Sequence, residues 1–152
     1  MATFDIDAEL EAIVRALTAR RLPYAVCGGI AVAVHGHPRA TTDIDIIVAA
    51  ETVDAVVETV RGLGYTLEAA PMRFSSGIEV RRISRVESGE LFTLDLMPVT
   101  DVLREVWDGR AQVTWRGQPL HIVSREGLIR MKRLASRAQD LADLEALGAD
   151  DE

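Results

Sequence analysis

The chain has 152 residues, of which 48% are apolar and 27% charged, and this composition excludes a disordered segment as the default interpretation. Its 17 Lys and Arg residues against 24 Asp and Glu residues give a net charge of −7, which argues against a surface that attracts nucleic acid non-specifically. A single cysteine, Cys27, excludes an intrachain disulfide.

The sequence predicts neither a signal peptide nor a membrane segment. Residues 1–5 lack the basic region of a signal peptide, and no stretch approaches the ~20 apolar residues that a membrane helix needs. We therefore expect a cytoplasmic protein. Because no repeat, linker or shift in composition marks a boundary, we expect one domain over residues 1–152, with the acidic tail at 148–152 frayed.

The first third of the chain alternates between helical and extended patterns. Residues 5–21 have apolar side chains at helical spacing, with Asp5 or Asp7 as a candidate cap and Pro23 after the end. The elements predicted next are a strand at 24–27, a helix at 30–34, a strand at 43–48 and a helix at 51–63.

The remainder of the chain is richer in strand patterns. Three strands are predicted at 65–69, 78–86 and 91–97, with a loop at 73–77. A short helix at 100–107, a hairpin of 113–115 with 120–123, and a helix that Ser124 caps and that runs to about 147, with a break near 137–138, complete the chain. The predicted fold class is α/β or α+β, with helices packed on a mixed sheet.

Two carboxylates lie two residues apart in the strand predicted at 43–48. Residues i and i+2 of a strand point to the same face, so Asp43 and Asp45 share one side while Ile44 and Ile46 face the other. Two carboxylates beside a buried strand are unfavourable unless a cation lies between them, and Mg²⁺ is commonly held by such groups together with substrate phosphates. The alternative is an edge strand whose aspartates face solvent.

A glycine turn, Gly28-Gly29, links the strand at 24–27 to the helix that follows. Glycines allow a tight turn and a close approach to a ligand, and the start of a helix offers free N–H groups to an anion. A plain tight turn is the alternative. The turn precedes the carboxylate pair by one short helix, which is consistent with a triphosphate at the turn and a metal at the carboxylates.

The segment GGIAVAVHGHPRATTDIDIIV, residues 28–48, resembles the signature of the DNA polymerase beta-like nucleotidyltransferase superfamily. In that superfamily a Gly-Gly or Gly-Ser turn precedes an Asp-x-Asp or Asp-x-Glu strand by one helix. The spacing of Arg39, Thr41 and Asp43 is most similar to small bacterial members: the AbiEii-type toxin group, the minimal nucleotidyltransferases and the lincosamide-modifying enzymes.

The resemblance implies a third acid on a neighbouring strand and a lysine in the last helix. Asp95 interrupts an apolar run and is the candidate acid, the alternative being a carboxylate that faces water beside Pro98. Lys132 is the only lysine, the other 16 basic residues being arginine, and is the candidate triphosphate ligand. The alternative for Lys132 is a solvated helix face. Arg137 with Asp140 fits a structural pair.

The implied activity is transfer of a nucleoside monophosphate, with AMP expected, from a nucleoside triphosphate to a hydroxyl group, in a modification or toxin–antitoxin role. Two Mg²⁺ or Mn²⁺ ions are implied among Asp43, Asp45 and Asp95. The implied triphosphate ligands are Gly28, Gly29, Arg39, Thr41 and Lys132. His35 and His37 lack further ligands at zinc spacing, so loop and cap roles are favoured for them.

The acceptor stays open at this point: a protein, a tRNA end or a small molecule would each supply a hydroxyl group. Its binding surface could come from a homodimer cleft, from a partner protein or from the loop at 71–77. The alternative function is a catalytically silent module that binds a nucleotide or a partner on the same fold. The presence of all three carboxylates argues against that alternative.

Overall fold

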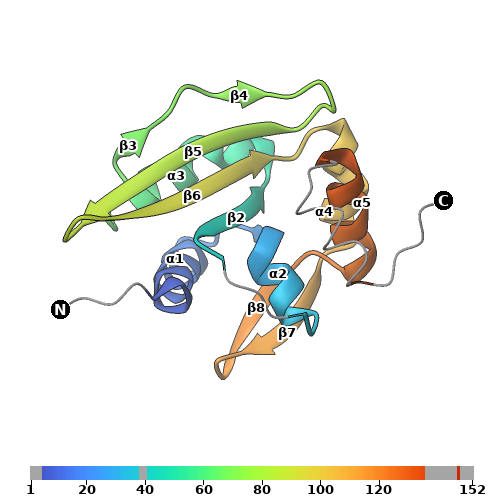
Figure 1. Ribbon diagram of the computed structural model, residues 1–152, viewed down its shortest axis with the longest axis horizontal. Coiled ribbons are helices and arrows are strands. Elements are labelled where there is room, and N and C mark those ends of the chain that lie inside the picture. Colours follow the sequence, from blue (N-terminus) through green and yellow to red (C-terminus); the bar gives the residue numbers. More distant parts are fainter. Residues whose placement is uncertain (1–4, 38–40, 136–146, 148–152) are drawn as a thin grey trace.

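The computed structural model describes residues 5–37, 41–135 and 147. Within these residues the chain forms five α-helices, two 3₁₀ turns and eight strands (Figure 1). The helical segments are α1 (Ile6–Ala19), α2 (Gly28–Val34), η1 (Ala50–Thr52), α3 (Val53–Arg61), η2 (Asp101–Leu103), α4 (Arg104–Asp108) and α5 (Arg125–Ala135). The strands are β1 (Tyr24–Cys27), β2 (Asp43–Val48), β3 (Leu67–Glu68), β4 (Met72–Arg73), β5 (Glu79–Glu87), β6 (Glu90–Pro98), β7 (Ala111–Trp115) and β8 (Gln118–Ile122).

The strands form one mixed sheet in the order β3-β5-β6-β2-β1-β8-β7, and β4 pairs with β5. Strand β2 is central: it runs parallel to β6 on one side and antiparallel to β1 on the other. A central strand is buried on both faces, which explains the apolar run from Ile46 to Val48 after the first half of the strand, where Asp43 and Asp45 alternate with Ile44. The mixed sheet with helices packed on it confirms the predicted fold class.

Helices cover both faces of the sheet (Figure 1). One buried cluster joins α1 and α3 to the sheet residues Ile44, Ile46, Leu94 and Leu96. The other joins α2, α4 and α5 to the opposite face, through Ile47 among others. Alternation along β2 therefore assigns the even-numbered residues to the α1 and α3 face and the odd-numbered residues to the α2 and α5 face.

Local signals that the sequence carries account for the helix starts. The Asp5 side chain accepts a hydrogen bond from the Ala8 N–H at 3.1 Å, and the Ser124 hydroxyl accepts one from the Gly127 N–H at 3.0 Å. Both are N-cap contacts, which satisfy a backbone donor that the first turn leaves without a partner. The predicted caps of the first and last helices are confirmed.

Several predicted bounds are wrong in detail. Helix α2 begins at Gly28 rather than at residue 30, and the strand predicted at 65–69 shrinks to β3, Leu67–Glu68. Arg73, predicted as the first residue of a loop at 73–77, belongs to strand β4, because Met72 and Arg73 pair with Val80 and Glu79. The predicted region beyond residue 135 lies, except for Leu147, outside the described residues. Among the described residues no helix is long and apolar enough to cross a membrane.

Candidate active site

Asp43 and Asp45 lie in the first half of β2, on the face that α2 and α5 cover. Ile44 and Ile46 between and after them are buried on the opposite face, so the predicted alternation holds. Both aspartates are partly exposed, in contrast to the fully buried second half of the strand. The two carboxylates therefore share one side of the sheet and are accessible to a ligand.

Gly28 lies directly against the second of these aspartates. Cys27 is paired with Asp45 in the β1–β2 register, and Gly28 follows with a φ of +67°. A Cβ atom on Gly28 would lie 2.0 Å from Asp45 Oδ2 and 2.8 Å from Asp45 Cγ. Two separate constraints, the left-handed backbone and the space that Asp45 occupies, therefore require glycine here.

Asp95 is brought beside Asp45 by the parallel pairing of β2 with β6, in which Asp45 and Asp95 are register partners. Neighbouring strands lie about 4.8 Å apart, and register partners of a parallel pair point to the same face. Asp95 is only 8% exposed. Asp43, Asp45 and Asp95, the three carboxylates that the sequence singles out, therefore lie on one face of two adjacent strands, and the alternative of an acid facing water beside Pro98 is wrong.

Asp95 forms an ion pair, through two hydrogen bonds, with a residue that the sequence pattern does not single out. The guanidinium of Arg82 donates from Nε to Asp95 Oδ1 at 2.8 Å and from Nη2 to Asp95 Oδ2 at 3.0 Å. Hydrogen bonds to Asp95, and the charges of Asp43 and Asp45, raise the pKa of Arg82 above its ordinary value. A signal for this pair exists in the sequence: a two-residue turn at Ser88-Gly89 makes Glu87 and Glu90 partners, and the same register pairs Arg82 with Asp95.

Lys132 is buried on the same side of the sheet. It is 6% exposed on α5, and α5 packs against α2, the helix that begins at Gly28. Burial, together with the charges of Asp45 and Asp95, raises the pKa of the Cys27 thiol, whereas the charge of Lys132 lowers it. One thiol at the end of β1 is therefore within electrostatic range of Lys132 and of two site carboxylates. The alternative of a solvated helix face is wrong for Lys132.

The other predicted residues lie at or near this group. Gly29 is buried at the start of α2, and the Thr41 hydroxyl donates to the backbone carbonyl of Asp43 at 3.3 Å. Arg39 lies outside the described residues, as do Arg137 and Asp140. His35 ends α2, and its Nε2 hydrogen bonds with the Val123 carbonyl at 3.0 Å, which agrees with the predicted cap role.

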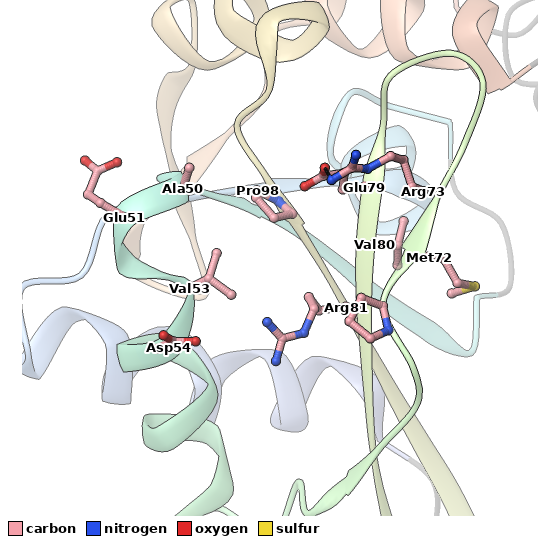
Figure 2. A pocket seen from close by; sticks show the side chains of 11 residues that line it. Ala50, Glu51, Val53, Asp54, Met72, Arg73, Glu79, Val80, Arg81 and Pro98 are labelled. Atoms are coloured by element: carbon pink, nitrogen blue, oxygen red, sulfur yellow. Dashed lines mark ion pairs between the residues drawn. The ribbon is translucent and has the colours of Figure 1, made fainter.

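A pocket of about 500 Å³ lies elsewhere, between η1, the start of α3 and strands β4 and β5 (Figure 2). Its walls include Ala50 in η1, two residues after the end of β2, and Pro98, the last residue of β6. The ion-paired residues Arg73 and Glu79 also line it. None of the residues singled out from the sequence as metal or triphosphate ligands lines it. Of the segment 71–77, one of the predicted acceptor surfaces, Pro71, Met72 and Arg73 line this pocket.

The carboxylates fit a hard divalent cation by their chemistry, since Mg²⁺ and Mn²⁺ prefer oxygen ligands. In the part of the chain that the structure describes, however, no three His, Cys, Asp or Glu side chains are already arranged to hold a metal ion together. Both oxygens of Asp95 accept hydrogen bonds from Arg82. Asp43, Asp45 and Asp95 are the residues that would hold such an ion, and Asp95 would do so only after exchanging its partner.

The site combines a glycine turn against Asp45, two aspartates on β2 and a third aspartate on the adjacent parallel strand β6. Together with the mixed sheet between helices, this arrangement defines a nucleotidyltransferase domain. Solved structures agree with this fold. The chain is similar to the lincosamide antibiotic adenylyltransferase LnuA in its lincomycin-bound form, with a TM-score of 0.66 and 17% identity over 93% of this chain and 95% of that one. It is also similar to ANT(2")-Ia in complex with adenylyl-2"-tobramycin (TM-score 0.62, 18% identity, 92% and 86% covered). A putative nucleotidyltransferase from Thermotoga maritima, TM1012, matches with a TM-score of 0.63 and 17% identity over 91% and 89%.

Sequence comparison narrows the class. Residues 9–92, more than half of the chain, match the aminoglycoside-2''-adenylyltransferase family, and this match includes Gly28, Gly29, Asp43 and Asp45. A search of curated protein sequences finds no match. The chain belongs to the aminoglycoside-2''-adenylyltransferase family.

Proposed function

We propose that the protein is a divalent-metal-dependent nucleotidyltransferase that transfers AMP from ATP to a hydroxyl group of a small molecule. The observation that carries the proposal is the register of Asp45 with Asp95, with Gly28 directly against Asp45. Carboxylates on one face of two adjacent strands repel one another, an arrangement that favours a cationic ligand. Membership of an adenylyltransferase family supports ATP as the donor.

Each residue has a defined task in this proposal. Asp43, Asp45 and Asp95 would hold two Mg²⁺ ions, which would neutralise the charge of the triphosphate. The backbone N–H groups of Gly28 and Gly29, the ammonium of Lys132, and the side chains of Arg39 and Thr41 hold the phosphates. Positioning and charge neutralisation supply most of the acceleration in such a transfer.

The chemical step joins the acceptor oxygen to the α-phosphorus and breaks the bond from that phosphorus to the bridging oxygen. Pyrophosphate leaves with the electron pair of the broken bond. Asp95, after it separates from Arg82, accepts the proton of the acceptor hydroxyl, because it is the carboxylate least exposed to water and adjacent to Asp45.

The family match favours a modification role over a toxin–antitoxin role. The family is named for an aminoglycoside-modifying activity, and two of the similar structures contain lincomycin and an adenylylated tobramycin. We therefore propose a small polyhydroxylated acceptor of this kind. A modifying enzyme needs all three carboxylates, and their presence in this chain disfavours the silent module.

The acceptor surface that we propose continues from Asp95 along the same face of the β5–β6 hairpin. Val86 and Leu91 are register partners and are 57% and 58% exposed. Leu91 is on the same face of β6 as Asp95, four residues or about 13 Å away. An exposed apolar pair at this distance suits the face of a sugar or a ring whose hydroxyl group reaches Asp95.

The test is transfer itself. The purified protein is incubated with Mg²⁺, with each of the four nucleoside triphosphates, and with a panel of aminoglycosides and lincosamides, and mass spectrometry detects acceptors that gain one nucleoside monophosphate. We expect an AMP adduct with ATP that depends on Mg²⁺ and is lost in Asp45→Asn. The proposal is contradicted if Asp45→Asn forms the same adduct at the same rate as the unchanged protein.

A further inference from the structure

Asp95 and Arg82 form an ion pair whose two side chains differ in solvent exposure and in flexibility. The Asp95 side chain is 11% exposed, on a strand that lies between β5 and the central β2, whereas the Arg82 side chain is 46% exposed. Aspartate has a short side chain fixed by its backbone, while arginine has a long flexible stem that can carry its charge into water. When the pair separates, Arg82 is therefore the member that moves.

The positive charge of Arg82 interacts with the negative charge of more than one carboxylate. It hydrogen bonds with both oxygens of Asp95, and the charges of Asp43 and Asp45 also act on its guanidinium. A single guanidinium thus lies in the field of all three site aspartates. A divalent cation that uses Asp95 as a ligand must compete with Arg82 for the same oxygens, since each carboxylate oxygen already accepts a hydrogen bond.

We propose that Arg82 is an exchangeable counterion that holds Asp95 in the nucleotide-free enzyme and releases it when the metal-bound nucleoside triphosphate arrives. This inference rests on the proposed function. Arg82 is a positioning residue in this account, because it acts through Asp95 and not on the reacting atoms. The consequence is coupling: metal alone competes with Arg82, whereas metal together with a triphosphate brings enough additional contacts to displace it.

The experiment measures binding of Mn²⁺ without nucleotide, by electron paramagnetic resonance of free Mn²⁺, in Arg82→Gln and in the unchanged protein. Removal of the competitor should tighten Mn²⁺ binding by about three- to tenfold, the range for a charge-assisted pair that is partly screened by solvent. The matched control is Arg81→Gln. Arg81 is adjacent on β5, has Leu96 as its register partner and is ion-paired with Glu68 at 3.2 Å, so its loss should change Mn²⁺ affinity by less than about twofold.

A general loss of positive charge would also raise Mn²⁺ affinity, so the comparison is repeated in an Asp95→Asn background. If Arg82 acts through Asp95, the gain from Arg82→Gln disappears there. The inference is overturned if Arg82→Gln binds Mn²⁺ no better than the unchanged protein, or if the gain persists with Asp95→Asn. Should Arg82→Gln fail to fold, Arg82→Lys replaces it and must give a smaller gain of the same sign.

The same titration separates this inference from the proposed function. If Asp45→Asn abolishes Mn²⁺ binding while Arg82→Gln leaves it unchanged, only the role of Arg82 is wrong. If Mn²⁺ binds with the same affinity to the unchanged protein and to Asp45→Asn, or binds to none of the variants, the metal site itself is wrong and both proposals fail.

Discussion

Gly28 is the residue of the candidate site at which the structure leaves least room for change. Its φ is +67°, and any Cβ atom would overlap Asp45 Oδ2. Gly89 offers a matched control, because its φ of +77° is similar but nothing lies within 4 Å of the place that a Cβ atom would take there. A comparison of the two positions therefore separates the backbone penalty from displacement of Asp45.

We predict that Gly28→Ala and Gly89→Ala both lower the free energy of unfolding by about 1 kcal/mol through the strained backbone, and that Gly28→Ala lowers it further through the clash. Only Gly28→Ala should abolish metal-dependent binding of ATP, because it displaces the Asp45 carboxylate. Urea denaturation and calorimetric titration measure the two effects. Normal ATP binding by Gly28→Ala would mean that the position of Asp45 is not critical.

Lys132 provides the second prediction at this scale. A contact between an ammonium and a phosphate contributes about 1.5–3 kcal/mol, so Lys132→Ala should weaken nucleoside triphosphate binding by about ten- to a hundredfold, with only partial recovery in Lys132→Arg. Arg130→Ala removes the same charge from the same helix but from a residue that pairs with Glu105 at 2.6 Å, and it should leave the affinity unchanged. Equal losses in Lys132→Ala and Arg130→Ala would point to a general electrostatic effect.

The residues that the sequence predicts best are those whose neighbours lie close along the chain. Gly28, Asp43 and Asp45 fall within one short segment, and strand alternation is enough to place the two aspartates on one face. Arg82 escapes prediction because its role depends on strand register, which a run of polar residues does not display. Its partner becomes evident only when Ser88-Gly89, with φ values of +52° and +77°, is identified as a two-residue turn.

At the scale of elements, the β5–β6 hairpin carries both the third carboxylate and the proposed acceptor surface. We predict that the double variant Val86→Ser with Leu91→Ser raises the KM for the acceptor severalfold while it leaves the KM for ATP unchanged, because both side chains are exposed beyond the metal ligands. Leu67→Ser is the control: Leu67 is 55% exposed on the outer strand β3.

Steady-state kinetics on an acceptor found in the transfer assay measures both KM values. An unchanged KM for the acceptor would place the acceptor elsewhere on the protein. An equal rise in the Leu67→Ser control would show that any loss of exposed apolar surface acts in the same way, which contradicts a specific role for the hairpin.

The long elements could be predicted from the sequence, and the short ones could not. Helix α1 has an apolar periodicity over several turns, and strands β2 and β6 contain apolar runs, so the sequence predicts these elements to within two residues of their bounds. Strands β3 and β4 are two residues each, and they exist because β5 offers its backbone groups to both. Pairing of this kind depends on the tertiary structure, and the local sequence around Met72 and Arg73 does not predict it.

For the molecule as a whole, the buried protonated groups predict how stability changes with pH. Burial raises the pKa of the Cys27 thiol and of the Tyr24 and Tyr65 hydroxyls above their ordinary values. In the unfolded chain these groups ionise from about pH 8.5 for cysteine and about pH 10 for tyrosine, while the folded protein keeps their protons. Above those values the folded state binds more protons than the unfolded state, so its stability falls as the pH rises.

We therefore predict that the free energy of unfolding is constant between about pH 7 and 8 with respect to these groups and declines from about pH 8.5 upward. Cys27→Ala should remove the earliest part of the decline and leave the part above about pH 10. Urea titrations at a series of pH values measure the curve. Stability that stays flat or rises between about pH 8.5 and 10.5 would contradict the assignment of these three groups as buried and protonated.

The central claim is that Asp43, Asp45 and Asp95 form a metal-dependent nucleotide site, and calorimetric titration with α,β-methylene-ATP tests it most directly. The analogue cannot undergo transfer, so the measurement does not depend on finding the acceptor. The account predicts that Mg²⁺ lowers the Kd by at least about tenfold relative to a chelator, and that Asp45→Asn removes this difference while circular dichroism shows an unchanged fold. Equal binding of the analogue with Mg²⁺ and with the chelator, or an undiminished Mg²⁺ effect in Asp45→Asn, would contradict it.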